Sequence, residues 1–71
     1  MKLSAIIRRE NQGYVSLCPE LDVASQGDTV EEAHSNLKEA LDLFFECAPL
    51  KEIQQRLSGE IYVSQIEVAF G

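Results

Sequence analysis

The chain has 71 residues, enough for one domain, and we predict a single domain over residues 1–71. A chain of this length buries only ~60% of the surface that its unfolded form exposes, which makes its core marginal. Self-association is therefore expected to add stability. Twelve acidic and six basic residues give a formal net charge of −6. This charge argues against nucleic-acid phosphates as the main partner and suits a basic protein, although acidity for solubility alone would also explain it.

The cysteine and histidine content predicts neither a metal site nor a cofactor. Cys18 and Cys47 do not form a Cys-x-x-Cys pair, and His34 is the single histidine. We expect both thiols to be free and to fill small apolar spaces, with a redox role as the alternative. The sequence shows no secretory leader and no apolar run long enough for a membrane span, so the expected compartment is the cytoplasm.

Alternating polar and apolar residues predict three strands in the first third of the chain. The first strand spans Lys2 to Arg9, and the second spans Tyr14 to Cys18 after a turn that contains Asn11. Pro19 cannot donate a ladder hydrogen bond and therefore ends the second strand. A weaker third strand is expected from Leu21 to Gln26.

A long amphipathic helix follows a predicted capping box. The Thr29 hydroxyl is expected to accept from the Glu32 amide while the Glu32 side chain reaches back. Apolar residues then recur at helical spacing along one arc: Val30, Ala33, Leu37, Ala40, Leu41, Phe44, Phe45 and Ala48. Asn36 is the polar exception on this arc, and we expect its amide to bond the backbone of the Ser25–Asp28 turn.

A second, shorter helix is predicted after Pro49, with Gly59 as its end, and Ile61 to Phe70 is predicted as a closing strand. The fold class is therefore α+β, in the order β-β-β-α-α-β, with a small, mainly antiparallel sheet and the long helix on one face. Nothing is predicted to cover the opposite face, which suggests that it meets a partner. The candidate interface residues are Ile6, Arg8, Tyr62 and Ile66.

The run from Gly13 to Leu41 resembles the HicB family of antitoxins. The matching residues are Gly13-Tyr14, Pro19-Glu20-Leu21, Ser25-Gln26-Gly27-Asp28-Thr29, Glu31-Glu32-Ala33, Asn36 and Glu39-Ala40. The resemblance implies a partial ribonuclease-H-like fold without nuclease activity. It also implies a function: binding and occluding a small, basic, RNA-cleaving HicA-like toxin, with the antitoxin as a homo-oligomer, a dimer or a tetramer. We take Gly13, Tyr14, Pro19, Gly27, Thr29, Glu32 and Asn36 as the structural motif.

Two departures from the family pattern limit what is carried over. The family commonly has Pro-Gly-Cys where this chain has Asp22-Val23-Ala24, so we expect a straighter strand there. Many members also carry a C-terminal DNA-binding region, which does not follow the predicted last strand here, so DNA binding is not expected. The alternative function is a stand-alone, homo-oligomeric module of the same fold that regulates or binds a ligand without a toxin partner.

The carboxylates do not suggest an enzyme. Ribonuclease-H-type hydrolysis needs several carboxylates that converge on two cations, partly from the first strand. The segment Lys2 to Arg9 contains no Asp or Glu, and Asp28, Glu32 and Glu67 suit helix capping or the surface. His34 lies at the edge of the apolar arc and is expected to be a boundary residue. We therefore predict no catalytic residue.

Overall fold

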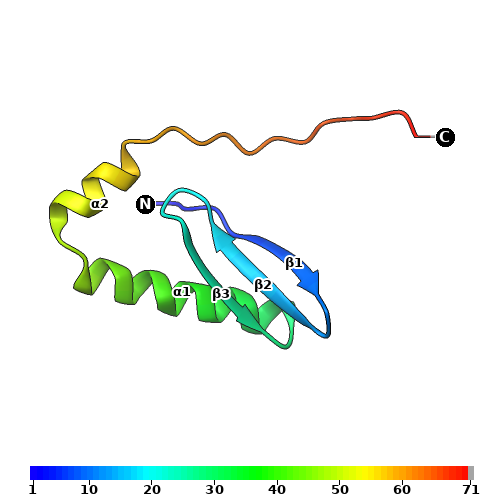
Figure 1. Ribbon diagram of the computed structural model, residues 1–71, viewed down its shortest axis with the longest axis horizontal. Coiled ribbons are helices and arrows are strands. Elements are labelled where there is room, and N and C mark those ends of the chain that lie inside the picture. Colours follow the sequence, from blue (N-terminus) through cyan, green and yellow to red (C-terminus); the bar gives the residue numbers. More distant parts are fainter. Residues whose placement is uncertain (71) are drawn as a thin grey trace.

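The computed structural model describes residues 1–70 and has the predicted α+β class. The elements, in chain order, are β1 (Ile6–Glu10), β2 (Gly13–Cys18), β3 (Val23–Gly27), α1 (Val30–Cys47) and α2 (Leu50–Leu57). Figure 1 shows the three strands side by side with α1 running along them, and α2 beyond one end of the sheet. Among residues 1–70, no helix is both long enough and apolar enough to cross a membrane.

The sheet is antiparallel in the order β1-β2-β3, and its register sets which residues share a face. Ser16 pairs with Ile7 and with Ser25, and this row faces α1, because the Ser16 hydroxyl donates to the Ala33 carbonyl at 2.9 Å. The next row, Ile6, Leu17 and Ala24, faces the other way, because successive side chains of a strand alternate.

The first strand begins later than its predicted start at Lys2. Ile6 pairs with Leu17 near the end of β2, and Pro19 then turns the chain away, so residues 1–5 have no neighbouring strand to pair with. The Ser4 amide instead donates to the Glu20 carboxylate at 3.0 Å.

The third strand also begins later than predicted, at Val23 rather than Leu21. Residues 19–22 form a turn in which Asp22 adopts a left-handed φ of 54°, which Asp tolerates better than most residues. The expectation of a straighter strand at Asp22-Val23-Ala24 is therefore wrong at its first residue. The turn places Leu21 inside the protein, where it is completely buried.

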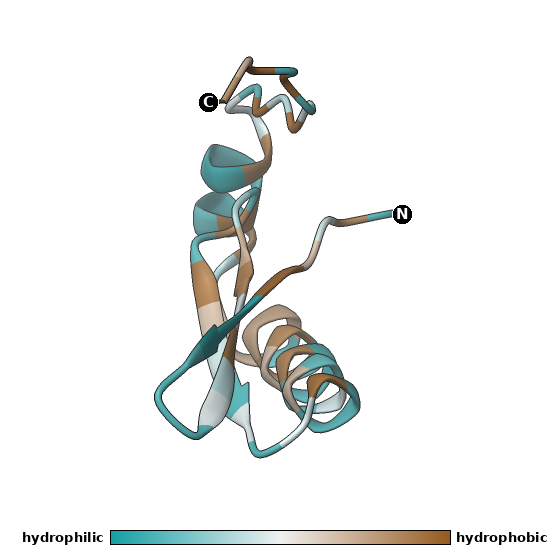
Figure 2. Ribbon diagram, turned by 90° about the vertical axis from the view of Figure 1, so that its right-hand side faces the viewer, coloured by the Kyte–Doolittle hydropathy of each residue, from teal (hydrophilic) through white to brown (hydrophobic). Residues whose placement is uncertain are grey.

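One helix covers one face of the sheet, as predicted. The core consists of Cys18, Leu21 and Leu37, with the α1 residues Leu41, Phe44 and Phe45 packed against it. Figure 2 shows α1 on one side of the sheet, and α1 is the described helix in extensive contact with the strands. The opposite face of the sheet is thus uncovered within residues 1–70.

Arg56 makes the main polar contacts that hold α2 against the rest of the fold. Its guanidinium donates to the Leu21 carbonyl, pairs with Glu52 at 3.0 Å and lies 5.0 Å from the centre of the Phe44 ring. Leu57 adds an apolar contact with the core. These contacts connect the second helix to the β2–β3 turn, 35 residues earlier in the sequence.

The predicted closing strand, Ile61 to Phe70, is not a strand. Residues 60–70, here called the tail, leave α2 as an extended segment without sheet pairing and run clear of the sheet in Figure 1. A strand needs a neighbour for its backbone N–H and C=O groups, and the tail runs past its own sheet without reaching either edge. The correct order within residues 1–70 is therefore β-β-β-α-α.

Replacement of Arg56 tests the attachment of α2. Arg56→Ala removes the bond to Leu21 and the contact with Phe44 together, so the free energy of unfolding should fall by about 1–3 kcal/mol. Urea unfolding followed by circular dichroism measures this change. Lys51→Ala, an exposed position on the same helix, is the control and should change stability by less than about 0.5 kcal/mol. Equal losses in the two variants would contradict the assigned role of Arg56.

Candidate functional site

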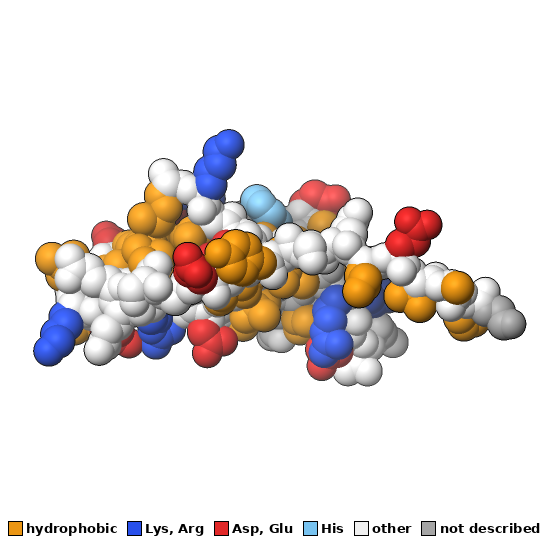
Figure 3. Space-filling view, turned by 90° about the horizontal axis from the view of Figure 1, so that it is seen from above, with side chains coloured by type: hydrophobic (Ala, Val, Ile, Leu, Met, Phe, Trp, Pro, Cys, Tyr) orange, Lys and Arg blue, Asp and Glu red, His pale blue; other side chains and the backbone are white. Residues whose placement is uncertain are grey.

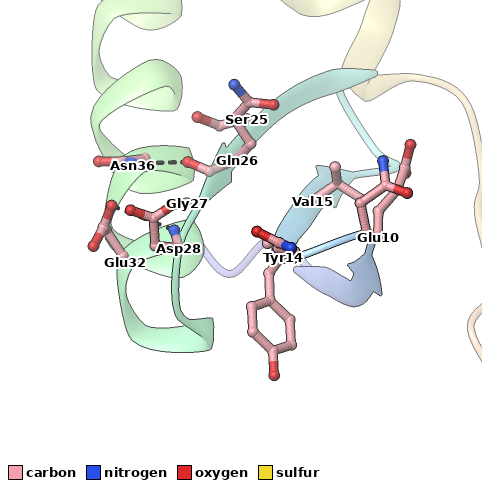
Figure 4. Close-up of a pocket in the computed structure, with 12 residues that line it drawn as sticks. Glu10, Tyr14, Val15, Ser25, Gln26, Gly27, Asp28, Glu32 and Asn36 are labelled. Atoms are coloured by element: carbon pink, nitrogen blue, oxygen red, sulfur yellow. Dashed lines mark hydrogen bonds between the residues drawn. The ribbon is translucent and has the colours of Figure 1, made fainter.

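Most of the motif residues gather around a hollow of about 620 Å³ at one end of the sheet. The hollow is lined by the β1–β2 turn, the end of β3 and the first turns of α1, as Figure 4 shows. Of the predicted motif, Gly13, Tyr14, Gly27, Glu32 and Asn36 line it. Thr29 contributes as the N-cap of α1, whereas Pro19 lies at the other end of β2 and does not join the group.

Two glycines allow the backbone to come close at this end of the sheet. A Cβ atom on Gly27 would lie 2.5 Å from the Ala33 nitrogen and 2.8 Å from the Glu32 carbonyl carbon. A Cβ atom on Gly13 would lie 3.1 Å from the Gly27 oxygen. The end of β3 thus touches the first turn of α1 backbone to backbone, which only glycine permits.

Asn36 joins the same two elements by a hydrogen bond. Its side-chain amide donates to the Gln26 carbonyl at 2.8 Å, so the predicted bond to the Ser25–Asp28 turn is confirmed. Figure 4 shows this bond crossing from α1 to β3. The Asn36 amide nitrogen is therefore engaged within the fold.

The capping box is present, but the Glu32 side chain bonds the Asp28 amide instead of the amide of the N-cap residue Thr29. The Thr29 hydroxyl accepts from the Glu32 amide at 3.0 Å, as predicted, but the Glu32 carboxylate accepts from the Asp28 amide at 3.4 Å. The two side chains thus satisfy donors at the start of the helix. The motif residues at this end of the sheet mainly build the junction between sheet and helix.

The charged residues around the hollow are all acidic: Glu10, Asp28 and Glu32. Glu10 is paired with Arg8 at 3.3 Å, and Asp28 and Glu32 lie on the opposite side in Figure 4. Within residues 1–70, no group of three or more His, Cys, Asp or Glu side chains could hold a metal ion. The hollow can offer polar contacts and negative charge.

Glu20 has a role that sequence reasoning missed, although it belongs to the Pro19-Glu20-Leu21 match. Its carboxylate accepts from the Ser4 hydroxyl at 2.6 Å, from the Ser4 amide and from the Cys18 thiol. These bonds, above all the one from the Ser4 hydroxyl, lower the pKa of the Glu20 carboxyl to about 2. Glu20 thereby attaches the N-terminal segment to the β2–β3 turn.

The two cysteines have different surroundings. Both thiols are free, and Cys18 is buried in the core, where burial raises the pKa of its thiol. Cys47 is exposed at the end of α1, so the prediction that it fills an apolar space is wrong. The exposed position of His34 agrees with its prediction as a boundary residue.

The uncovered sheet face is the second candidate surface. Ile6 is 43% exposed and Leu17 beside it is 36% exposed, with Val15 and Arg8 in the next row. Of the predicted interface residues, Ile6 and Arg8 thus lie together on this open face, defined here as the face of the sheet opposite α1. Leu17 and Val15 belong to the open face but were not among the predicted interface residues.

Tyr62 and Ile66 lie apart from the other two predicted interface residues. Both are in the tail, 83% and 87% exposed. Figure 3 shows hydrophobic side chains along the narrow projecting part of the molecule that the tail forms. The predicted interface therefore divides into two separate surfaces, the open face and the tail.

Comparison with known proteins shows the family of the chain. It is 32% identical to a UPF0150 protein of Helicobacter pylori in an alignment of 71 positions that covers 99% of each chain. It is 43% identical to a UPF0150 protein of Synechocystis in an alignment of 61 positions that covers 83% of each chain. No family model and no solved structure matches the sequence. The chain belongs to the UPF0150 family.

The close approach at Gly27 predicts a strong effect of adding one methyl group. Gly27→Ala places a Cβ atom against the backbone of α1, so the free energy of unfolding should fall by about 3 kcal/mol. Gly59→Ala is the matched control, because its Cβ atom would meet the Arg56 oxygen at an ordinary 3.7 Å. Thermal or urea unfolding compares the two. A Gly27→Ala protein as stable as the control would contradict the contact.

The bonds to Glu20 predict a specific loss of stability in acid. Because its pKa is about 2 in the folded chain and ordinarily 4.5, the ionised carboxylate stabilises the fold above about pH 4.5. That contribution is lost as the pH falls from there towards about 2.

Urea unfolding at pH values from about 6 to about 2 measures this loss. Glu20→Gln should remove part of the wild-type decrease, whereas Glu39→Gln, at an exposed helix position, should leave it unchanged. Identical pH profiles for the wild type and Glu20→Gln would refute the assignment.

Proposed function

We propose that this UPF0150 protein is a non-catalytic, HicB-like antitoxin of a type II toxin–antitoxin pair. It binds a small, basic, RNA-cleaving toxin of the HicA type and occludes it. The observation that carries the proposal is the one-sided sheet, whose open face exposes Ile6 and Leu17 with no described element packed over it. The resemblance of Gly13–Leu41 to HicB antitoxins supports the same function.

The open face has the composition of a contact surface. Ile6, Leu17 and Ala24 form an apolar row across all three strands, and Arg8 and Glu10 border it as an exposed ion pair. Apolar area at the centre gives affinity when a partner excludes water from it, while a charged border contributes orientation. A partner that packs on the open face would cover the apolar side chains that α1 leaves exposed.

The charge of the chain favours a basic partner. A net charge of −6 attracts a cationic protein over a distance of about 10 Å at ordinary salt and raises the rate of encounter. Asp28 and Glu32, beside the hollow at the end of the sheet, contribute to this negative charge. Occlusion requires no bond to be made or broken by the antitoxin, since a bound antitoxin keeps RNA out of the toxin's active site.

A second candidate function follows from the hollow itself. A stand-alone, homo-oligomeric module would use the space of about 620 Å³ to receive a small polar ligand and would have no toxin partner. One observation distinguishes the two functions. The antitoxin requires a toxic partner protein encoded beside its own gene, and the stand-alone module does not.

The test of the proposed function is co-expression with the product of the neighbouring open reading frame. The neighbour alone should stop growth, the pair should restore growth, and the two proteins should co-purify. A neighbour that is harmless and forms no complex overturns the antitoxin proposal.

Substitution on the open face locates the contact. Ile6→Asp should weaken the complex at least about tenfold, because it places a carboxylate in an apolar contact. Titration calorimetry measures affinity, and circular dichroism checks that α1 is intact. Leu43→Asp is the control, since Leu43 is also an exposed apolar residue, at 58%, and lies on α1. Equal affinity of Ile6→Asp and the wild type would exclude the open face as the toxin contact.

A further inference from the structure

The tail has the composition of a strand but lacks a neighbour. Six large apolar side chains lie between Ile61 and Phe70, and each is between 46% and 103% exposed. They are Ile61, Tyr62, Val63, Ile66, Val68 and Phe70. All are β-branched or aromatic, the residue types most enriched in strands. Soluble proteins rarely leave such a run in water, so the tail is expected to be covered in the assembled protein.

The two edges of the sheet differ in charge. The β3 edge contains no charged residue and is flanked by Asp22 and Asp28. The first ten residues, which end with β1, contain Lys2, Arg8 and Arg9 against a single acid, Glu10. This β1 edge, comprising residues 1–10, is therefore positive, and the β3 edge has acidic ends.

The charge of the tail matches the β1 edge. The tail carries Glu60 and Glu67 and no basic residue. Opposite charges on neighbouring strands are favourable, and like charges are unfavourable. The tail is thus attracted to the β1 edge and repelled by the acidic ends of the β3 edge.

Length and shape agree with this choice. Ile61–Phe70 and the β1 edge each comprise ten residues, and residues 1–5 of that edge have no ladder partner within the chain. A groove of about 170 Å³ lies beside them, between the N-terminal segment and α1. Its apolar lining includes Leu3, Ala5 and Leu41. One row of side chains from a strand added at the β1 edge would enter this groove.

We propose that the tail of one chain adds as a fourth strand to the β1 edge of a second copy, and that two chains exchange tails across a two-fold axis. The occupant is a second copy because the tail has no sheet pairing within its own chain, runs clear of its own sheet in Figure 1 and leaves its apolar side chains exposed. Reciprocal exchange of one element is a common route to a closed dimer.

This dimer would solve two problems of the single chain. Only four apolar residues of the described chain are fully buried, Cys18, Leu21, Ala33 and Leu37, and the exchanged strands would bury more. Each added strand also pairs the free backbone groups of the β1 edge, which would otherwise invite aggregation. The proposal does not depend on toxin binding, and its test uses the protein without a toxin.

The first test blocks the strand. In reducing buffer, which keeps the exposed Cys47 thiols unlinked, sedimentation should give the wild type twice the chain mass of 7.9 kDa. Ile66→Pro removes a backbone donor from the tail and should give a monomer with unchanged helical circular dichroism. Leu43→Asp, an apolar-to-charged change on α1, should remain dimeric. A dimeric Ile66→Pro protein, or a monomeric wild type, overturns the proposal.

The second test shows exchange between chains. One variant carries Arg8→Glu with Arg9→Glu, and the other carries Glu60→Lys with Glu67→Lys. Alone, each variant sets like charges against each other, so its dimer should dissociate at least about tenfold more readily. Mixed, each tail meets an edge of opposite charge in the other chain, so the mixture should form a heterodimer.

The outcome of mixing separates exchange from pairing within one chain. A mixture that stays monomeric overturns exchange. Hydrogen exchange of the tail amides gives an independent readout. Protection that increases with protein concentration supports pairing with a second copy, and protection in a monomer contradicts it.

Discussion

The contact between the end of β3 and the first turn of α1 is the constraint on which the rest of the fold depends. At Gly27 the two backbones are too close for any side chain, and Asn36 closes the junction with a bond to Gln26. The angle at which α1 leaves the sheet places Ala33 and Leu37 over it, where they are buried. The core therefore exists because the junction holds the helix against this face of the sheet.

The β2–β3 turn has a corresponding role at the other end of the sheet. Glu20 holds the N-terminal segment through Ser4, and the Leu21 carbonyl receives Arg56 from α2. The Leu21 side chain meanwhile lies inside the core. Two segments that are distant in sequence are thus attached to one short turn. Polar contacts make these attachments, in a chain that buries little apolar area.

These anchors leave two apolar surfaces uncovered, and both proposals concern them. The motif residues Gly13, Gly27, Thr29 and Asn36 maintain the sheet–helix junction, so their contacts support the fold. The proposed binding surfaces are the open face, for a toxin, and the tail, for a second copy. The proposed tail contact uses the backbone edge of β1, whereas the open face presents side chains, so both contacts can exist in one assembly.

The sequence by itself determined the elements that depend on neighbouring residues. The α1 helix, its cap at Thr29 and the first hairpin follow from periodicity and turn chemistry within a few residues, and the bond of Asn36 followed from a polar residue on an apolar arc. The tertiary structure alone decided where β1 and β3 begin, because a residue of either strand can pair only where a residue of β2 lies beside it. It also decided the roles of Glu20 and Arg56, whose partners lie 16 and 35 residues away. The tail shows the same division: its alternation predicts a strand, but a strand forms only where a sheet edge is within reach, and the tail runs clear of the edges of its own sheet.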